Sequence, residues 1–517
     1  MLTTDIRNRI EAGMGSLIGF SIDTDRMNEP YFVMTKHPDG RIRLDHSGPI
    51  GIPHCTGRAL DALLTAESMT GIPIPAEVEE ALTFYHFASF SNRDGLNSYV
   101  DHQQEGQRFI QMHNIREGLL GLVALVKYRS NARAREVADR MLDKLNDLTT
   151  KEGAFSAKLA EQEGIIDRLQ DLEGPPPMSS GRFIRALVRY HCETGSMLAL
   201  DLASRYANYN LKTAFTLEGG LTEAAGDHGH SITSTVESIL EYAIFIADEN
   251  MIDHCRRIYD RGLRTFRSDT GWCSELVSGQ SGRGEANNTG DLIQIALLLG
   301  KHSDARYFED AERFMRSHLL PAQLMDSESL PENSDRVEDC LKNIRARARG
   351  SFGFPLMNDR FLPGERIDIA TMDITSGAVQ ALCAYYQSIV ERKEKQVMIH
   401  LFCDIRTPEV SLASFLPDFG KIEIAVHREC DLSVRLPLWA DEQGLSVQIN
   451  GDGKRLQIEN GYILMDHMQQ NSSVIIEFDL TENITEETLL DTNFTIKWRG
   501  NQVLDVKPAG IEQPLFP

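Results

Sequence analysis

The sequence predicts an (α/α)6 toroid, a mainly α-helical barrel, followed by a C-terminal β-sandwich. One observation is a cluster of small and polar residues that recurs six times, each time where an apolar helical stretch begins. A second is that five of the six copies are followed by a more charged helical stretch, as in stacked helical hairpins with an inner and an outer ring. A third is the change to strand-like periodicity near residue 395. The clusters are Thr56-Gly57-Arg58, Asn114–Gly118, Ser180-Gly181-Arg182, Ser234–Glu237, Thr289-Gly290-Asp291 and Thr375-Ser376-Gly377.

These clusters have a physical meaning at the start of a helix. Ser, Thr and Asn side chains cap the free amide groups of the first turn, and a glycine there leaves room for a close neighbour. If six inner helices close into a ring, their first turns gather around one cavity. We therefore expect the functional residues of this chain at that end of the barrel.

Three regions follow one another along the chain. Residues 1–50 are expected to be extended, with a hairpin around Pro38-Asp39-Gly40. Residues 51–395 carry the barrel, in which apolar side chains recur at i, i+3, i+4 and i+7. Residues 396–517 contain short apolar strands separated by turns, which is typical of a β-sandwich. Within the barrel, the segment 321–370 is longer than a standard connection, and such insertions often shape a binding site.

Composition argues against two classes of partner. Of 517 residues, 53 are Lys or Arg and 76 are Asp or Glu, so the formal net charge is −23. Such a surface repels nucleic acids and anionic membranes, and no stretch reaches the roughly 18–20 apolar residues of a membrane span. The segment Met1–Arg7 lacks a basic stretch followed by an apolar core, so we expect a cytoplasmic protein.

The eight cysteines are scattered and form no C-x-x-C pair, which indicates free thiols instead of a metal site or a disulfide framework. We therefore expect neither a metal nor a cofactor. The oligomeric state stays open, and a homo-oligomer is compatible with the sequence.

Carboxylates around the fifth and sixth clusters are the strongest candidates for chemistry. Glu275, Glu285 and Asp291 lie on or before the fifth inner helix, and Asp373 lies at the sixth. Cleavage of a glycoside needs one carboxylic acid to protonate the leaving oxygen and a second carboxylate across the sugar. Trp272, close to these acids, could stack on a sugar ring. The alternative is that Glu285, Asp291 and Asp373 are local helix-start charges.

Polar residues at the other helix starts are candidates for binding a substrate. The pair His228 and His230, separated by one glycine, could bind sugar hydroxyls or a carboxylate, although a capped loop with exposed histidines is equally compatible. Two histidines alone are a weak metal signal. Arg116 is a further candidate for binding the substrate, although it could instead form a structural pair with Glu117. The remaining candidates are His54, His113, Asn287 and Asn288.

Three stretches resemble a known family. They are Glu285–Leu320, which contains E-A-N-N-T-G-D-L, Gly377–Tyr386, and Leu432–Ala440, which reads L-S-V-R-L-P-L-W-A. Over roughly residues 50–515 the chain resembles glycoside hydrolases related to bacterial β-L-arabinofuranosidases, and it is similar to barrel β-glucuronidases. The resemblance implies an (α/α)6 barrel with β-sandwich modules.

The resemblance also shows departures at the site. The family holds a zinc with a Glu-x-Cys motif and a Cys-Cys pair, one cysteine being the nucleophile. Here the matching positions are Glu285-Ala286-Asn287 and Asp373-Ile374, so every thiolate is absent and no zinc is expected. Glu275 lies near the position of the family's acid/base glutamate.

The leading hypothesis is an exo-acting glycoside hydrolase that uses two carboxylates on a terminal sugar, a uronic acid or L-arabinofuranose, of a complex glycan. Glu275 would be the general acid/base, and Asp373 or Glu285 the second carboxylate. Two alternatives stay open: a polysaccharide lyase that cleaves uronic acid glycans by β-elimination, and a carbohydrate-binding protein without catalysis.

Overall fold

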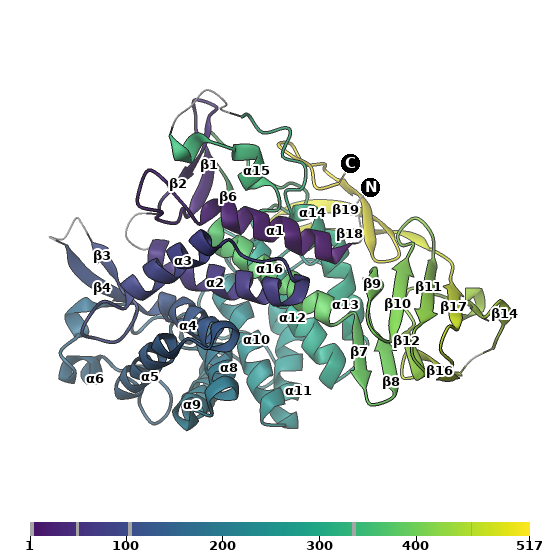
Figure 1. Cartoon of the computed structure of the whole chain (residues 1–517), viewed down its shortest axis with the longest axis horizontal. Coiled ribbons are helices and arrows are strands. Elements are labelled where there is room, and N and C mark those ends of the chain that lie inside the picture. Colours follow the sequence, from purple (N-terminus) through teal and green to yellow (C-terminus); the bar gives the residue numbers. More distant parts are fainter. Residues whose placement is uncertain (1–4, 48–50, 102–105, 333–337, 456, 517) are drawn as a thin grey trace.

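The computed structural model describes residues 5–47, 51–101, 106–332, 338–455 and 457–516. Within these ranges, six inner helices form a ring in which each helix packs on the next and the last packs on the first (Figure 1). The predicted toroid is therefore confirmed. The inner helices are α2 (Gly51–Thr70), α4 (Ile115–Arg129), α8 (Ile184–Thr194), α10 (Gly229–Phe245), α12 (Ala286–His302) and α16 (Met372–Gln387).

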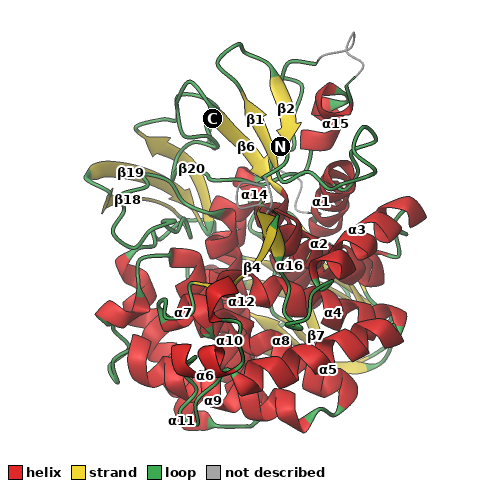
Figure 2. Ribbon diagram, turned by 90° about the vertical axis from the view of Figure 1, so that its left-hand side faces the viewer, coloured by secondary structure: helices red, strands yellow, loops and turns green. Residues whose placement is uncertain are grey.

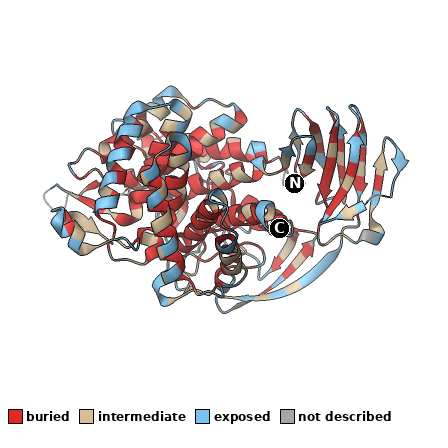
Figure 3. Cartoon of the chain, turned by 90° about the horizontal axis from the view of Figure 1, so that it is seen from below, coloured by how far each residue is buried: buried red, intermediate tan, exposed pale blue. Residues whose placement is uncertain are grey.

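An outer helix packs behind each inner helix. The first five follow their inner partners directly in the chain, as the sequence predicts. They are α3 (Ala76–Ser89), α5 (Ala132–Asp147), α9 (Met197–Ala214), α11 (Glu249–Arg257) and α13 (Tyr307–Phe314), of which the last two continue into π-helical turns. Figure 3 shows the inner helices mostly buried, with exposed residues on the outer faces of the ring.

The sixth outer helix comes from the opposite end of the chain. Helix α1 (Ile6–Phe20) packs against α16 and α2, and the Asp5 side chain caps it by accepting from the amide of Asn8. The expectation that residues 1–50 are extended is therefore wrong for this helix. Its apolar face is completed by a partner more than 350 residues away, so the hairpin pattern that identified the other pairs is missing here.

Glycines in the second turns of inner helices α2 and α16 allow close contact. A Cβ atom on Gly57 would lie 1.8 Å from the carbonyl oxygen of Glu117, and one on Gly377 would lie 2.2 Å from Asn287 Oδ1. Real Cβ atoms do not approach other atoms so closely. The ring therefore depends on the absence of side chains at these positions.

The capping role expected for the clustered hydroxyls is wrong. In the described structure, no side-chain cap is found at α4, α8, α10, α12 or α16. Several of the clustered hydroxyls donate to carbonyls one turn back, as Thr56 of α2 does to Ile52 (2.8 Å), whereas Thr289 and Thr375 donate to the carbonyls of Gly271 and Phe352 outside their own helices. Side-chain caps instead occur on outer helices, at Asn131, Ser196 and Asp248. The inner helices begin inside the protein, where polar groups other than a capping side chain lie close to their first turns.

The predicted β-sandwich follows the barrel. One sheet has the order β15-β16-β12-β8-β7 and the other β14-β13-β17-β11-β10-β9, with antiparallel pairing except between β8 and β12. The strands are β7 (Val390–Lys393), β8 (Gln396–Ile399), β9 (Ile405–Arg406), β10 (Val410–Ser414), β11 (Lys421–Val426), β12 (Cys430–Arg435), β13 (Ser446–Ile449), β14 (Asp452–Gly453), β15 (Gln457–Glu459), β16 (Tyr462–Met468) and β17 (Ser473–Glu477).

The end of the chain leaves the sandwich and returns to the barrel. Strands β18 (Glu482–Leu489), β19 (Thr492–Arg499) and β20 (Gln502–Lys507) form a sheet of their own, seen above the helices in Figure 2. Ile496 and Trp498 of this sheet pack in one apolar cluster with Trp272 and Met357 of the barrel. The single sandwich expected for residues 396–517 is therefore two units.

A small antiparallel sheet covers the start of α16. The hairpin expected near residue 39 is confirmed: β1 (Val33–Lys36) pairs with β2 (Ile42–Asp45). Strand β6 (Ile367–Thr371), which leads directly into α16, pairs with β1. A further small sheet contains β3 (Tyr99–Asp101), β4 (Gln107–Gln111) and β5 (Leu169–Gln170). Among the described helices, none is long and apolar enough to span a bilayer.

Candidate active site

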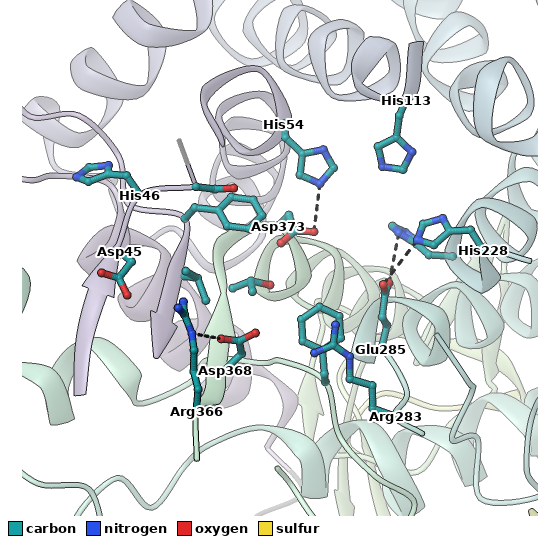
Figure 4. Close-up of a pocket in the computed structure, with 16 residues that line it drawn as sticks. Asp45, His46, His54, His113, His228, Arg283, Glu285, Arg366, Asp368 and Asp373 are labelled. Carbon is teal, nitrogen blue, oxygen red and sulfur yellow. Dashed lines mark ion pairs between the residues drawn. The ribbon is translucent and has the colours of Figure 1, made fainter. Parts of the chain in front are cut away.

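A cavity of about 390 Å³ lies where several inner helices begin, and residues of the β1–β2–β6 sheet line part of it (Figure 4). The first turns of α2, α10 and α16 contribute to it, together with the residues just before α4 and α12. Six of the residues proposed from the sequence line this cavity, as the ring geometry requires. They are His54, His113, His228, His230, Glu285 and Asp373.

Glu285 lies between two imidazoles. Its Oε1 is 3.8 Å from His228 Nε2, and its Oε2 is 3.6 Å from His230 Nδ1. The residue is only 6% exposed, and its buried Oε2 has no hydrogen-bond partner among the described residues. A buried carboxylate oxygen without a partner is costly unless a ligand uses it. Glu285 is therefore presented to the cavity as a group for chemistry or binding.

His230 is neutral, and its ring proton faces Glu285. Burial lowers the pKa of His230 well below its ordinary value, and the positive charges of Arg116 and Arg58 add to this effect. Nη1 of Arg116 lies 3.3 Å from His230 Nε2. Because a guanidinium can only donate, Nε2 accepts and the single ring proton is on Nδ1, which faces Glu285.

Asp373 is held as an anion. Burial raises its pKa, but His54, whose Nε2 lies 3.4 Å from Oδ2, and Arg58 at 3.8 Å outweigh burial, so the pKa lies well below its usual range. Its Oδ1 is buried without a hydrogen-bond partner in the part of the chain that the structure describes. The Asp373 carboxylate therefore contributes a negative charge to the cavity, next to His54.

A buried charge cluster supports the histidines from behind. Glu117 accepts hydrogen bonds from Arg116 (2.8 Å) and Arg182 (3.0 Å), and these two cations lower its pKa to about 2 although burial raises it. Arg182 also lies 2.7 Å from the ring of His113. Arg116 therefore forms the structural pair with Glu117 and also positions His230, and it does not itself line the cavity.

The structure places Glu275 behind the cavity wall. Both of its carboxylate oxygens accept from Arg283, at 2.8 and 2.9 Å, and that guanidinium stacks 3.7 Å from the centre of the Phe354 ring. Arg283 and Phe354 line the cavity, whereas Glu275 does not. A general acid must offer a proton to the leaving oxygen, and this carboxylate is occupied by an arginine.

Trp272, Asn287 and Asn288 are also buried outside the cavity lining. Trp272 is 2% exposed and donates from Nε1 to the carbonyl of Pro355 at 2.9 Å, so its ring is not free to stack on a sugar. Asn288 donates to the carbonyl of Ser274 at 2.8 Å. The sequence places these residues close to the site, but their side chains hold the surrounding loops together.

Sequence reasoning missed the residues that the small sheet contributes. They include carboxylates, a histidine and an aromatic ring from strands that pair across more than 300 residues, so no local pattern could identify them. Only the unusual length of segment 321–370 hinted that it shapes a binding site. The missed lining residues are Phe32, Val33, Asp45, His46, Ser47, Arg283, Phe354, Arg366, Asp368 and Thr371.

The residues present do not fit the zinc of the family that the sequence resembles. Asn287, at a position where that family has a cysteine, accepts from Arg58 Nη2 at 3.3 Å, so a guanidinium lies between Asn287 and Asp373. Burial raises the pKa of the nearby thiols Cys55 and Cys273, which are therefore neutral. Arg58 supplies a fixed positive charge at the place where the metal would be held.

Comparison with known proteins identifies relatives by structure alone. No family model matches the sequence, and neither does any curated protein. A GH127 β-L-arabinofuranosidase from Geobacillus stearothermophilus T6 is 14% identical and has a TM-score of 0.58, over 86% of this chain and 75% of that chain. A second GH127 β-arabinofuranosidase is 13% identical with a TM-score of 0.61, over 96% and 79%. A structure described as a glycoside hydrolase is 11% identical with a TM-score of 0.56, over 86% and 76%.

These likenesses agree with the fold expected from the sequence resemblance, a helical barrel with a C-terminal β domain. At such low sequence identity, these likenesses show a shared fold and do not show a shared activity. The chemistry of the site has to be argued from this chain's own residues.

Proposed function

We propose that this chain is a glycoside hydrolase that removes a terminal sugar from a larger glycan. The observation that carries the proposal is the pair Glu285 and Asp373. Both line one cavity from the starts of neighbouring inner helices, and each has a buried oxygen without a partner among the described residues. Hydrolysis of a glycoside needs such a pair. The structural neighbours, which are two β-arabinofuranosidases and a glycoside hydrolase, support the same reaction class.

The environments of the two carboxyls suggest different roles. Asp373, whose pKa is held low beside His54 and Arg58, is suited to be the nucleophile or the base that activates water. Glu285 is the other buried carboxyl of the pair, and its ion pairs among the described residues are with two histidines, so we assign to it the protonation of the leaving oxygen. The general-acid role that the sequence suggested for Glu275 is therefore transferred to Glu285.

The charges of the cavity favour a neutral terminal sugar over a uronic acid. Of the arginines that line it, Arg283 is bound by Glu275, and Arg366 lies 3.9 Å from Asp368. A uronate carboxylate would need an uncommitted cation, and it would also meet the negative charge of Asp373. A pentofuranose such as L-arabinofuranose has no charge to compensate.

The experiment uses a panel of nitrophenyl glycosides that includes β-L-arabinofuranoside and β-D-glucuronide. We expect release from one neutral sugar. Release from the glucuronide alone would overturn the neutral-sugar assignment. An unsaturated, ultraviolet-absorbing product from a uronic acid glycan would favour a lyase, and no turnover on any substrate would favour a binding protein.

Variants then separate the roles. D373N should lower kcat/KM by about 10³-fold or more on every substrate. Nitrophenolate leaves without being protonated, so E285Q should lose little on nitrophenyl glycosides but about 10²–10⁴-fold on a methyl glycoside of the same sugar. E275Q, a matched control outside the cavity, should keep activity within about tenfold on both. An E275Q variant with the profile expected of E285Q would reverse the assignment.

A further inference from the structure

One buried carboxyl close to the candidate acid has no role in the proposed function. Asp291, a carboxylate of the fifth sequence cluster, lies in the second turn of α12, which Glu285 precedes. It is 7% exposed and does not line the cavity. Its Oδ2 accepts a hydrogen bond from Thr233 of α10 at 2.6 Å, and its one ion pair among the described residues is with His230. A buried carboxyl without a lysine or arginine partner is costly as an anion.

The imidazole of His230 lies between Asp291 and Glu285. Its Nδ1 is 3.6 Å from Glu285 Oε2, and its Nε2 is 3.7 Å from Asp291 Oδ2. Both distances are about 0.5 Å longer than a normal hydrogen bond, as is common for catalytic contacts before a substrate binds. One ring from α10 therefore connects two carboxyls at the start of α12.

The arginine beside the ring determines where the protons are. Nε2 of His230 accepts from Arg116, so the ring proton is on Nδ1 and faces Glu285. A bare Nε2 is repelled by an anionic Asp291 but can accept from a protonated one. Burial raises the pKa of Asp291 to about 7, and the negative charge of Glu237 adds to this effect. Below that pH, Asp291 therefore carries a proton on the far side of the ring from Glu285.

Charged groups of several other elements surround Asp291. Burial and the charge of Glu237 outweigh two arginines and a threonine hydroxyl, which lower the pKa of Asp291. Both arginines also pair with other carboxylates, which divides their charge. A thiol near Asp291 and an imidazole on the outer side of α12 are neutral, because burial shifts the pKa of each toward the uncharged form. These groups are Arg116 of α4, paired with Glu117; Arg58 of α2, paired with Asp373 of α16; Thr233 and Glu237 of α10, the latter paired with Arg185 of α8; Cys273; and His318 after α13.

We propose that Asp291 holds the proton that Glu285 delivers to the leaving oxygen, and that His230 passes it between them. This inference rests on the proposed function. The O–H bond of Asp291 breaks as an N–H bond forms at Nε2 of His230, while the N–H bond at Nδ1 breaks and an O–H bond forms at Glu285. Glu285 then protonates the leaving oxygen as the glycosidic bond breaks, and Asp291 is left as a carboxylate. Asp291 lies outside the cavity and is a positioning residue for this proton.

The test compares two substrates over a range of pH. A methyl glycoside needs its leaving oxygen protonated, whereas a nitrophenyl glycoside does not. For the wild-type protein, we expect kcat/KM on the methyl glycoside to fall above about pH 7, where Asp291 loses its proton. D291N keeps the shape of the side chain but releases no proton. It should lower kcat/KM on the methyl glycoside about 10²-fold at about pH 6, remove the fall near pH 7, and change the nitrophenyl glycoside less than about threefold.

Two further variants make the test specific. Asp61 of α2 is another buried carboxyl of the ring whose pKa burial raises, and it accepts a hydrogen bond from Gln380. D61N is therefore the matched control and should change neither substrate nor the pH dependence. T233V removes a hydrogen bond that lowers the pKa of Asp291, so the fall should move to higher pH, which damage to the fold would not cause. Equal losses on both substrates in D291N with the fall near pH 7 retained, or an unmoved fall in T233V, would overturn the proposal.

Nitrogen NMR of the histidine rings separates this proposal from the proposed function. Comparison with H230Q identifies the signals of His230. In the wild-type protein the ring proton should move from Nδ1 to Nε2 as the pH rises through about 7, because ionised Asp291 then accepts it. This change should persist in D61N and be absent from D291N. If the wild-type protein hydrolyses no glycoside, the hydrolase proposal fails and the titration still decides whether His230 and Asp291 share a proton. Identical His230 titrations in wild type and D291N would show that they do not.

Discussion

Two buried histidines connect the outer ring to the inner ring by the same contact. His86 on α3 lies 3.1 Å from Thr56 Oγ1, and His318, in the π-helical turn after α13, lies 3.0 Å from Thr289 Oγ1. Both threonines belong to a Thr-Gly cluster of an inner helix. Burial lowers the pKa of each imidazole to about 4. The repeated clusters therefore have partners for their hydroxyls that the sequence pattern did not reveal.

These histidines should make the fold sensitive to acid. In the unfolded chain their pKa is about 6.5, so between that value and 4 only the unfolded state binds the protons. Stability is full above pH 6.5 and is lost as the pH falls toward 4. At pH 5 the loss should be about 2 kcal/mol for each histidine.

The measurement is the free energy of unfolding in denaturant at pH 7 and pH 5. In H86N the difference between the two pH values should shrink by about 2 kcal/mol relative to wild type. His467 has a side chain that is 85% exposed, so H467N should leave the difference unchanged. An unchanged difference in H86N would show that His86 binds its proton in the folded state.

At the scale of elements, the inner helices meet through glycines. Helices α2 and α4 approach so closely that a Cβ on Gly57 would lie 1.8 Å from the carbonyl oxygen of Glu117, and one on Gly121 would lie 2.6 Å from Gly57 Cα. The obstacle at Gly57 is backbone, which cannot rotate away as a side chain can. The spacing of this helix pair also sets the distance between His54 and His113, which stack at 5.3 Å in the cavity.

G57A should therefore destabilise the protein by about 3 kcal/mol or more, since the two helices have to separate. The control is G15A on α1, where a new Cβ meets nothing within 4 Å; it should be neutral or stabilising by up to about 1 kcal/mol because alanine favours helix. Denaturant unfolding compares the two. A G57A protein as stable as wild type would contradict the close contact.

The elements also show which parts of the molecule could be predicted from the sequence. The five local hairpins could be, because each inner helix and its outer partner are adjacent in the chain. Helix α1 and the pairing of Met34 with Ala370 could not, since their partners lie more than 300 residues away. The position of Glu275 could not be predicted for a related reason: Ser274 and Gly284 form a bridge, which aligns Glu275 with Arg283 and leaves it outside the cavity lining.

At the scale of the whole molecule, a buried ion cluster joins the barrel to the sandwich. Arg435 on β12 donates to Glu309 of α13 at 2.5 Å and to Glu312 of the same helix. Glu312 also accepts from Arg316 at 3.2 Å and from the amide of Phe402 at 3.1 Å. All three charged partners of this contact, Arg435, Glu309 and Glu312, are at least nine-tenths buried. Each region therefore contains buried charged groups whose hydrogen-bond partners lie in the other region.

Removing the shared cation should uncouple the two regions. R435M leaves two buried carboxylates without their main partner, which should cost about 3–5 kcal/mol and lower the midpoint of thermal unfolding. Because the lost contact lies between the barrel and the sandwich, calorimetry should resolve two transitions where the wild-type protein gives one. Arg428, 64% exposed and 3.7 Å from Glu409, is the control, and R428M should cost less than about 1 kcal/mol. A single transition at the wild-type midpoint in R435M would mean that the apolar contacts alone hold the sandwich on the barrel.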